Sequence, residues 1–236
     1  GAWTFANFET MVGDWKFSTA FKNTLLLAAI VVPVQVVLAL AMSVLVLKLS
    51  RGRDLILYIF TIPLGISDLA AGLIWLSIFE QTGFLNSMLA GLGLVDRPGI
   101  WLGYQDKTTL LIAVALAEIW RATAIVLVIL VAGMSMIPKE YYEAGEVFGA
   151  GPWQRFTRIT LPMLRPSLQT ALILRTILAF EVFAVVAALA GTNLPNLMGE
   201  TYNWQFALQD RGVAAALALV ILGISIAATL VFLKAL

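Results

Sequence analysis

The feature that most constrains this chain is a series of apolar stretches, each bounded by charged or turn residues. A helix needs about 20 mostly apolar residues to cross the hydrocarbon core of a bilayer. Because 61% of the residues are hydrophobic and only 12% are charged, an ordinary soluble domain is excluded. The sequence therefore predicts an all-α, polytopic membrane bundle of about five transmembrane helices, at residues 24–47, 55–79, 109–136, 168–189 and 213–236.

The charges of the connecting segments predict how this bundle is oriented. Residues 48–54 and 138–166 together carry seven basic and four acidic residues, whereas the remaining connections carry more acids than bases. Basic connections stay on the cytoplasmic side of a membrane. We therefore expect a cytoplasmic segment at 137–166, an external N-terminus for this sequence and a cytoplasmic C-terminus.

The N-terminal residues 1–23 are expected to form an external or interfacial segment, and residues 24–236 a single transmembrane domain. Since the predicted N-terminus is external and no membrane crossing precedes it, we also expect a further helix upstream of Gly1. The loop at 191–211 would face the outside, where it forms either a docking surface for a soluble protein or an ordinary interfacial loop.

Ionisable residues inside apolar stretches are costly in a bilayer and are therefore candidates for function. Glu118 and Arg121 are three residues apart on one predicted helix, so they can pair with each other. Arg175 and Glu181 do not share a helix face, so each needs another partner or a water-filled cavity. Structural pairing and a place in a substrate path both remain open. The candidate path residues, two of which are aromatic, are Asp68, Trp75, Glu118, Arg121, Arg175, Glu181 and Phe183.

The segment at 137–166 is too long and too patterned for a simple turn. Pro138 suits the first turn of a helix, whose dipole would favour the acidic residues that follow it. Gly149 and Gly151, directly before Pro152, should end that helix and allow a second one to run to about Leu161. The pattern predicts two short helices joined by a glycine hinge.

This segment resembles the coupling motif of binding-protein-dependent ATP-binding-cassette (ABC) importer permeases, in which Glu-Ala-Ala is followed by a Gly and then by Ile-x-Leu-Pro. Two positions depart from that pattern: Gly145 replaces the second Ala, and Phe148 stands where sugar importers commonly have Asp. The residues that carry the resemblance, and that it assigns to coupling with an ATPase, are Glu143, Ala144, Gly145, Gly149, Ala150, Phe156, Ile159, Leu161 and Pro162.

Weaker matches elsewhere resemble the maltose-type sugar permease branch; they include Asn23-Thr24, Ile62-Pro63 and Trp120. The resemblance implies a permease for a mono- or disaccharide in the plasma membrane of a bacterium or archaeon, with glycerol phosphate or another polyol as the alternative substrate. It also implies a second, related permease subunit, two ATPase subunits that bind ATP and Mg²⁺, and an extracytoplasmic substrate-binding protein. A short helix seated in a groove of the ATPase would transmit force to the bundle. The alternative is that Glu143 merely caps a helix.

Catalysis by this chain itself is not expected. The sequence contains no His or Cys and no phosphate-binding Gly-x-x-x-x-Gly-Lys-Ser/Thr loop, so we expect no metal site, no bound cofactor and no ATPase activity of its own. Its basic residues are scattered, which gives no indication of a nucleic-acid partner. An intramembrane enzyme and an ion-gradient secondary transporter are the two alternative classes of protein. A secondary transporter would be expected to show paired broken helices, whereas the sequence indicates a break only near Pro63.

Overall fold

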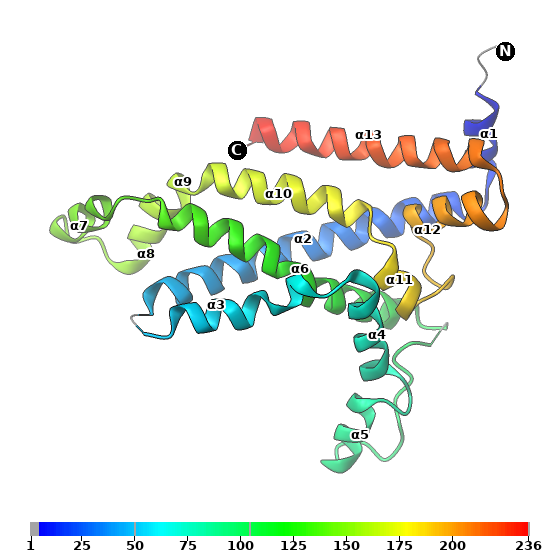
Figure 1. Cartoon of the computed structure of the whole chain (residues 1–236), viewed down its shortest axis with the longest axis horizontal. Coiled ribbons are helices and arrows are strands. Elements are labelled where there is room, and N and C mark those ends of the chain that lie inside the picture. Colours follow the sequence, from blue (N-terminus) through cyan, green and yellow to red (C-terminus); the bar gives the residue numbers. More distant parts are fainter. Residues whose placement is uncertain (1–4, 50, 104, 236) are drawn as a thin grey trace.

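Four long helices form the body of the protein. The computed structural model describes residues 5–49, 51–103 and 105–235, and within these ranges every regular element is helical. The body consists of α2 (Phe17–Lys48), α6 (Lys107–Ser135), α10 (Arg165–Phe180) and α13 (Arg211–Ala235), which run along the long axis of the molecule (Figure 1). The all-α membrane bundle predicted from the sequence is confirmed.

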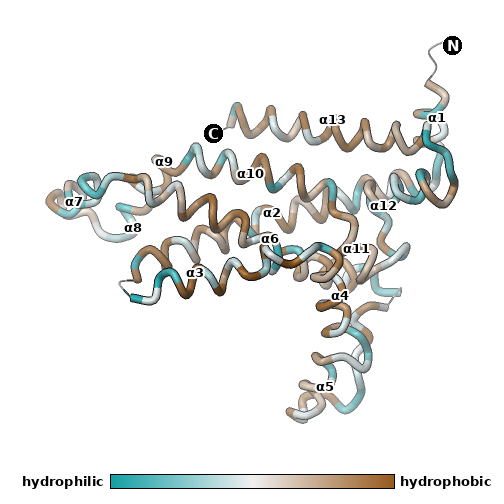
Figure 2. Tube along the Cα trace, viewed as in Figure 1, coloured by the Kyte–Doolittle hydropathy of each residue, from teal (hydrophilic) through white to brown (hydrophobic). Residues whose placement is uncertain are grey.

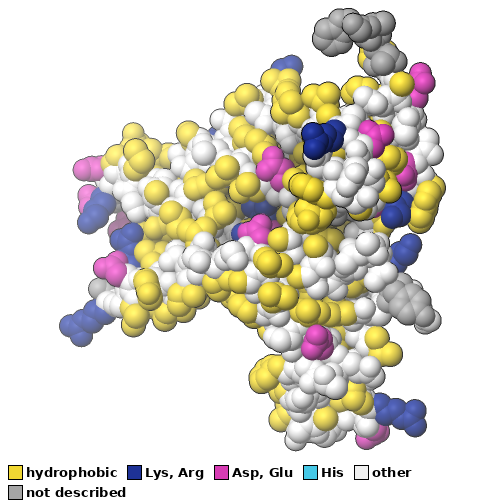
Figure 3. Space-filling view, turned by 45° about the vertical axis from the view of Figure 1, so that its right-hand side comes forward, with side chains coloured by type: hydrophobic (Ala, Val, Ile, Leu, Met, Phe, Trp, Pro, Cys, Tyr) yellow, Lys and Arg dark blue, Asp and Glu magenta, His cyan; other side chains and the backbone are white. Residues whose placement is uncertain are grey.

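The long helices have the length and composition of membrane spans. Among the described residues, α2, α6 and α13 are each long and apolar enough to cross a bilayer, and a bent pair of helices would bring the number to four. Figure 2 shows the apolar residues concentrated along these helices, with hydrophilic residues mainly at the ends and in the connections. The space-filling view likewise shows most charged side chains toward the ends of the bundle (Figure 3).

The apolar stretch at 55–79 is broken into α3 (Arg53–Thr61), the 3-10 turn η1 (Ile62–Gly65) and α4 (Asp68–Phe79). The helices on the two sides of the break differ in direction by 98°. Ser67 adopts an extended conformation and caps the new helix, because its hydroxyl accepts a hydrogen bond from the Ala70 N–H at 3.2 Å. Together with α5 (Phe84–Gly91), α4 forms an arm that leaves the bundle (Figure 1).

A second break interrupts the stretch at 168–189. Helix α10 ends at Phe180 and α11 (Ala184–Leu189) begins after a short irregular segment. The side-chain amide of Asn196 donates a hydrogen bond to the Val182 carbonyl in this segment, which satisfies a backbone group that no longer has a helical partner. The expectation of a single break near Pro63 was therefore wrong. No Pro or Gly marks the second break, and the residue that stabilises it comes from a separate loop.

The two broken stretches pack directly against each other. Gly72 of α4 lies so close to α11 that an added Cβ would be 2.7 Å from Cβ of Ala188 and 3.2 Å from Cα of Val185. Small residues at helix contacts allow such close backbone approach in membrane proteins. Val114 of α6, Val185 of α11 and Val31 of α2 are buried in one cluster beside this contact. The breaks thus adjoin the packed centre of the molecule.

The two ends of the bundle carry different short elements (Figure 1). At one end lie α1 (Ala6–Gly13), α12 (Leu197–Tyr202) and the π-helical turn η3 (Asn203–Ala207). At the other end lie α7 (Lys139–Val147), α8 (Pro152–Arg155), the π-helical turn η2 (Phe156–Thr160) and α9 (Leu161–Met163). Part of the expected N-terminal segment, residues 1–4, lies outside the described residues. In the rest of it, Met11 is buried in a cluster with Val213 and Leu217 of α13.

Candidate functional site

The segment at 137–166, called the coupling segment below, is a bent pair of short helices. Helix α7 ends in a two-bond cap: the Ala150 N–H donates to the Gly145 carbonyl at 2.8 Å and the Gly149 N–H to the Glu146 carbonyl at 2.9 Å. This pattern requires a left-handed residue after the helix, and Gly149 has φ of 74°. A helical run from Pro152 to Met163 follows. The hinge therefore has a defined conformation.

Contacts between the two short helices hold the bend. A Cβ added at Gly145 would lie 3.0 Å from Cδ1 of Ile159, so the missing side chain permits close packing. The hydroxyl oxygens of Tyr142 and Thr160 are 3.0 Å apart and share a hydrogen bond. Arg155 of α8 also forms an ion pair with Glu146 of α7. The departure of Gly145 from the family pattern is thus explained by tight packing against the second helix.

The tip of the coupling segment exposes large apolar side chains. Phe148 is 89% exposed and Val147 is 84% exposed, and Trp153 is also exposed. Burying such residues against a partner would be favourable. Phe148 and Val147 are not among the coupling residues predicted from the sequence, although two consecutive apolar residues before a hinge glycine were the available signal.

The predicted coupling residues are distributed over both faces of the segment. Glu143 is exposed and takes part in none of the ion pairs found among the described residues. The three apolar residues that the resemblance assigned to coupling, Phe156, Ile159 and Leu161, are only partly exposed, and Ile159 packs against Gly145. Ala144, Gly149 and Pro162 are exposed, and Gly145 and Ala150 are partly exposed.

A network of charged and polar side chains begins inside the bundle and reaches its surface, and it is called the charged centre below. Its members are Gln35 of α2, Asp68 of α4, Glu118 and Arg121 of α6, and Arg175 of α10. Arg175 and Glu118 are each only 1% exposed, and Nη2 of Arg175 lies 2.7 Å from Oε2 of Glu118. Nε of Arg175 donates to Oε1 of Gln35 at 2.6 Å, and Nε2 of Gln35 donates to the Glu118 carbonyl at 2.8 Å. Three long helices are therefore joined at this point.

The charged centre continues from Glu118 toward the surface. Arg121 lies 3.5 Å from Glu118, which confirms the predicted pair, and 2.8 Å from Oδ1 of Asp68. Asp68 is 51% exposed and is the first residue of α4, directly after the break. Two arginines balance two carboxylates, so the network has no net charge. It links α4 of the arm to α6 of the bundle through the Arg121–Asp68 ion pair, which a change in the arm's position would break.

The two aromatic candidates lie in separate clusters. Trp75 stacks on Phe79 at a centroid distance of 5.2 Å and meets the edge of Trp120 at 6.1 Å. Phe183 stacks on Tyr202 of α12 at 4.8 Å. The structure therefore does not bring Trp75 and Phe183 together in one site.

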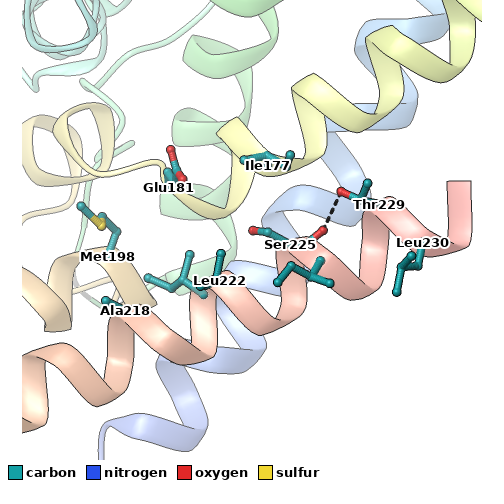
Figure 4. A pocket seen from close by; sticks show the side chains of 10 residues that line it. Ile177, Glu181, Met198, Ala218, Leu222, Ser225, Thr229 and Leu230 are labelled. Carbon is teal, nitrogen blue, oxygen red and sulfur yellow. Dashed lines mark hydrogen bonds between the residues drawn. The ribbon is translucent and has the colours of Figure 1, made fainter. Parts of the chain in front are cut away.

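Glu181 has a different environment from the other intramembrane charges. It lies at the end of α10 beside a cleft of about 420 Å³ between α10 and α13, which is lined mainly by apolar side chains such as Met198 and Leu222 (Figure 4). Glu181 is the only charged residue of this lining, and it forms none of the ion pairs found among the described residues. Within the described residues no group of three or more Asp or Glu side chains could hold a metal ion.

These features define a class of protein. The bundle combines apolar helices of membrane-spanning length, two further apolar stretches that are broken, and charged residues paired in its interior. These features are typical of membrane transport proteins. Comparison with known sequences gives the family. The chain belongs to the family described as binding-protein-dependent transport system inner membrane component, which matches residues 35–233. It is therefore a multi-pass inner-membrane protein and a transport component.

Individual relatives carry the names of sugar permeases. The chain is 32% identical to the trehalose/maltose transport system permease protein MalF of Thermococcus litoralis over 192 residues, which cover 78% of this chain and 62% of the relative. It is also 32% identical to the diacetylchitobiose uptake system permease protein NgcF of Streptomyces coelicolor, covering 97% of this chain and 69% of the relative. This chain thus spans less than two thirds of the first of these relatives.

A solved structure shows the same fold. The chain superposes with a TM-score of 0.83 on a chain of a bacterial ABC transporter involved in the import of the acidic polysaccharide alginate, with 25% sequence identity. The match covers 98% of this chain and 84% of the other.

Proposed function

We propose that this chain is the permease subunit of an ABC importer and forms part of the translocation path for a sugar. A soluble substrate-binding protein would deliver the sugar, and separate ATPase subunits would supply the energy. Family membership and the names of the relatives support the transport role. The observation that carries the coupling role is the exposed tip at Val147 and Phe148 on a hinge of defined conformation.

The coupling role follows from the shape and rigidity of the coupling segment. A projecting helix with an apolar tip fits a groove on a partner, where buried aromatic side chains provide most of the binding free energy. Glu143, which is exposed and forms none of the ion pairs found among the described residues, is available to a basic or N–H donor in that groove. The Glu146–Arg155 ion pair and the Gly145–Ile159 contact would transmit a displacement of the tip to the start of α10.

The charges of the proposed path favour a neutral substrate. The charged centre has no net charge, and its most exposed member, Asp68, offers acceptors to sugar hydroxyls. Glu181, which forms none of the ion pairs found among the described residues, adds a carboxylate that would repel an anion such as glycerol phosphate. Phe183 and Trp75 lie in separate clusters, so each would offer an apolar face to the sugar at a different point of the path. A mono- or disaccharide therefore fits these groups better than a phosphate ester.

The proposed assembly contains a second permease subunit, related to this one, and two ATPase subunits that bind ATP and Mg²⁺. The coupling segment would face the cytoplasm together with the C-terminal end of α13. The loops around α12 would then face the substrate-binding protein.

The coupling role can be tested with Glu143→Lys and Gly149→Asp in the complete transporter. Both residues are exposed, and the left-handed φ of Gly149 adds only about 1–2 kcal/mol of strain to Gly149→Asp, so both variants should insert into the membrane and fold. We expect loss of sugar uptake while the ATPase subunits retain ATP hydrolysis, measured as uptake and phosphate release in proteoliposomes. Normal uptake by both variants, with the ATPase subunits still bound, would refute the coupling assignment.

The substrate can be tested separately with labelled compounds. Uptake of a panel of mono- and disaccharides, glycerol phosphate and other polyols would be measured in cells that lack the native transporter gene. We expect uptake of a neutral sugar, and preferential uptake of glycerol phosphate would refute the substrate assignment without affecting the coupling assignment.

A further inference from the structure

A large cleft opens beside the coupling segment and includes none of the proposed path residues in its lining. It has a volume of about 1090 Å³ and lies between α2, α6 and the coupling segment. One wall is apolar and includes Val37, Val44 and Leu45 of α2. Val37 and Leu45 are exposed, so this wall continues into the outer surface of a membrane-spanning helix. Acyl chains could therefore reach the cleft from the surrounding bilayer.

The lining of this cleft is strongly cationic. Lys48, Arg53, Lys139 and Arg155 line it, and its described lining includes no Asp or Glu. Arg155 is neutralised by the ion pair with Glu146. The other three cations take part in none of the ion pairs found among the described residues. Positive charge therefore remains without a counter-charge at this position.

Arg53 carries an unpaired hydrogen-bond donor at this cleft. Its Nη2 donates to the Ser135 hydroxyl at 3.3 Å, while its buried Nε has no hydrogen-bond partner among the described atoms. A guanidinium group binds phosphate oxygens through two adjacent N–H groups. Arg53 would gain the bond that its Nε lacks if a phosphate group entered the cleft.

We propose that this cleft binds an anionic phospholipid. The phosphate would lie among Lys48, Arg53 and Lys139, and the acyl chains would lie against the α2 wall. Basic pockets between membrane helices suit acidic lipid head groups. A purely apolar partner helix would leave the three cations unpaired, whereas a small soluble anion would leave the apolar wall uncovered. Because Tyr142 and Trp153 also line the cleft, the lipid would contact both α2 and the coupling segment.

The first experiment measures lipid retention on the complete purified transporter. The probe is phosphatidylglycerol, compared with phosphatidylcholine, and bound lipid is counted by native mass spectrometry. The test variant combines Lys48→Gln, Arg53→Gln and Lys139→Gln. Its matched control combines Lys22→Gln, Lys107→Gln and Arg211→Gln, three exposed cations that do not line the cleft.

Wild type and control are expected to retain phosphatidylglycerol in preference to phosphatidylcholine. Since each cation near a lipid head group contributes about a fivefold change in affinity, the test variant should bind on the order of 100-fold more weakly. Equal retention of both lipids by wild type, or unchanged retention by the test variant, would overturn the proposal.

A second experiment does not depend on the folding of a triple variant. A photoreactive amino acid replaces Leu45 in the cleft wall of otherwise unchanged transporter, which is reconstituted in vesicles of phosphatidylglycerol and phosphatidylcholine. Cross-linking mainly to phosphatidylglycerol is the expected result. Cross-linking to another polypeptide, or to both lipids in proportion to their abundance, would show that the cleft is not an anionic-lipid site.

Discussion

The coupling segment and the charged centre use side chains in opposite ways. Phe148 at the tip of the coupling segment is 89% exposed, whereas Arg175 in the charged centre is 1% exposed and paired with two side chains. Apolar side chains are left uncovered at the first site, and charged side chains are enclosed at the second. The difference indicates that the coupling segment is completed by a partner, whereas the buried contacts of Arg175 with Glu118 and Gln35 are made within this chain.

This comparison predicts that Glu118→Ala has the largest effect. The substitution leaves Arg175 buried without its carboxylate partner, and breaking a buried ion pair in this way costs about 3–5 kcal/mol. We expect a large fall in the thermal unfolding midpoint of the purified transporter and a low yield. The control is the double variant Glu118→Gln with Arg175→Gln, which removes both charges and should recover much of the stability. An unfolding midpoint like that of wild type for Glu118→Ala would show that the centre does not hold the helices together.

The second prediction concerns the exposed tip. Phe148→Ala should leave the unfolding midpoint of this chain nearly unchanged but weaken binding to the ATPase by about 2 kcal/mol, roughly 30-fold. Binding is measured by titrating ATPase subunits onto the reconstituted permease. Phe84→Ala is the matched control, because Phe84 is an exposed aromatic residue at the start of α5, outside the coupling segment. If both variants bind the ATPase with equal affinity, Phe148 does not lie in the interface.

The third prediction tests the hinge with a pair of glycines. Gly149→Ala forces a side chain into a left-handed conformation with φ of 74°, which costs about 1–2 kcal/mol. Gly151→Ala is the control, because its φ is −67° and an added Cβ there meets no atom within 4 Å. Hydrogen exchange at the end of α7 should be faster in Gly149→Ala and unchanged in Gly151→Ala. Identical exchange in the two variants would mean that the hinge conformation is not fixed.

The smallest expected effect is a pH-dependent change at the start of α6, outside both the coupling segment and the charged centre. Hydrogen bonds from the Thr109 hydroxyl and N–H to the Asp106 carboxylate lower the pKa of Asp106. A lowered pKa in the folded state means that this stabilisation is complete above the ordinary carboxyl pKa and is lost as the pH falls through the folded pKa. Amide exchange in the first turn of α6 should therefore increase only at strongly acidic pH. In Asp106→Asn, amide exchange in the first turn of α6 should no longer show this increase at acidic pH. If the increase persists, a group other than Asp106 causes it.

The features that could be predicted from the sequence are the ones set by neighbours along the chain. The apolar stretches predicted the long helices, the three-residue spacing predicted the Glu118–Arg121 pair, and Gly149 marked the hinge. Each of these depends on local periodicity or on the conformational freedom of one residue. The ends of the helices were less accurate: α2 begins at Phe17, seven residues before the expected start.

The features that could not be predicted depend on residues far apart in the chain. Arg175 pairs with Glu118 and Gln35, which lie 57 and 140 residues away. The break after Phe180 depends on Asn196, a loop residue that reaches the Val182 carbonyl. The apolar tip was also missed, because Phe148 was judged by its departure from a motif and not by its exposure. Contacts of this kind can be identified only from the folded structure, because the sequence does not show which distant residues meet.

The central claim is that the apolar tip of the coupling segment is buried against an ATPase subunit in the assembled transporter. The most direct measurement replaces Phe148 with a photoreactive phenylalanine analogue and irradiates membranes that contain the complete transporter. The account predicts a specific cross-link from position 148 to the ATPase subunit. A cross-link only to lipid, or to a protein on the outer face of the membrane, would contradict it.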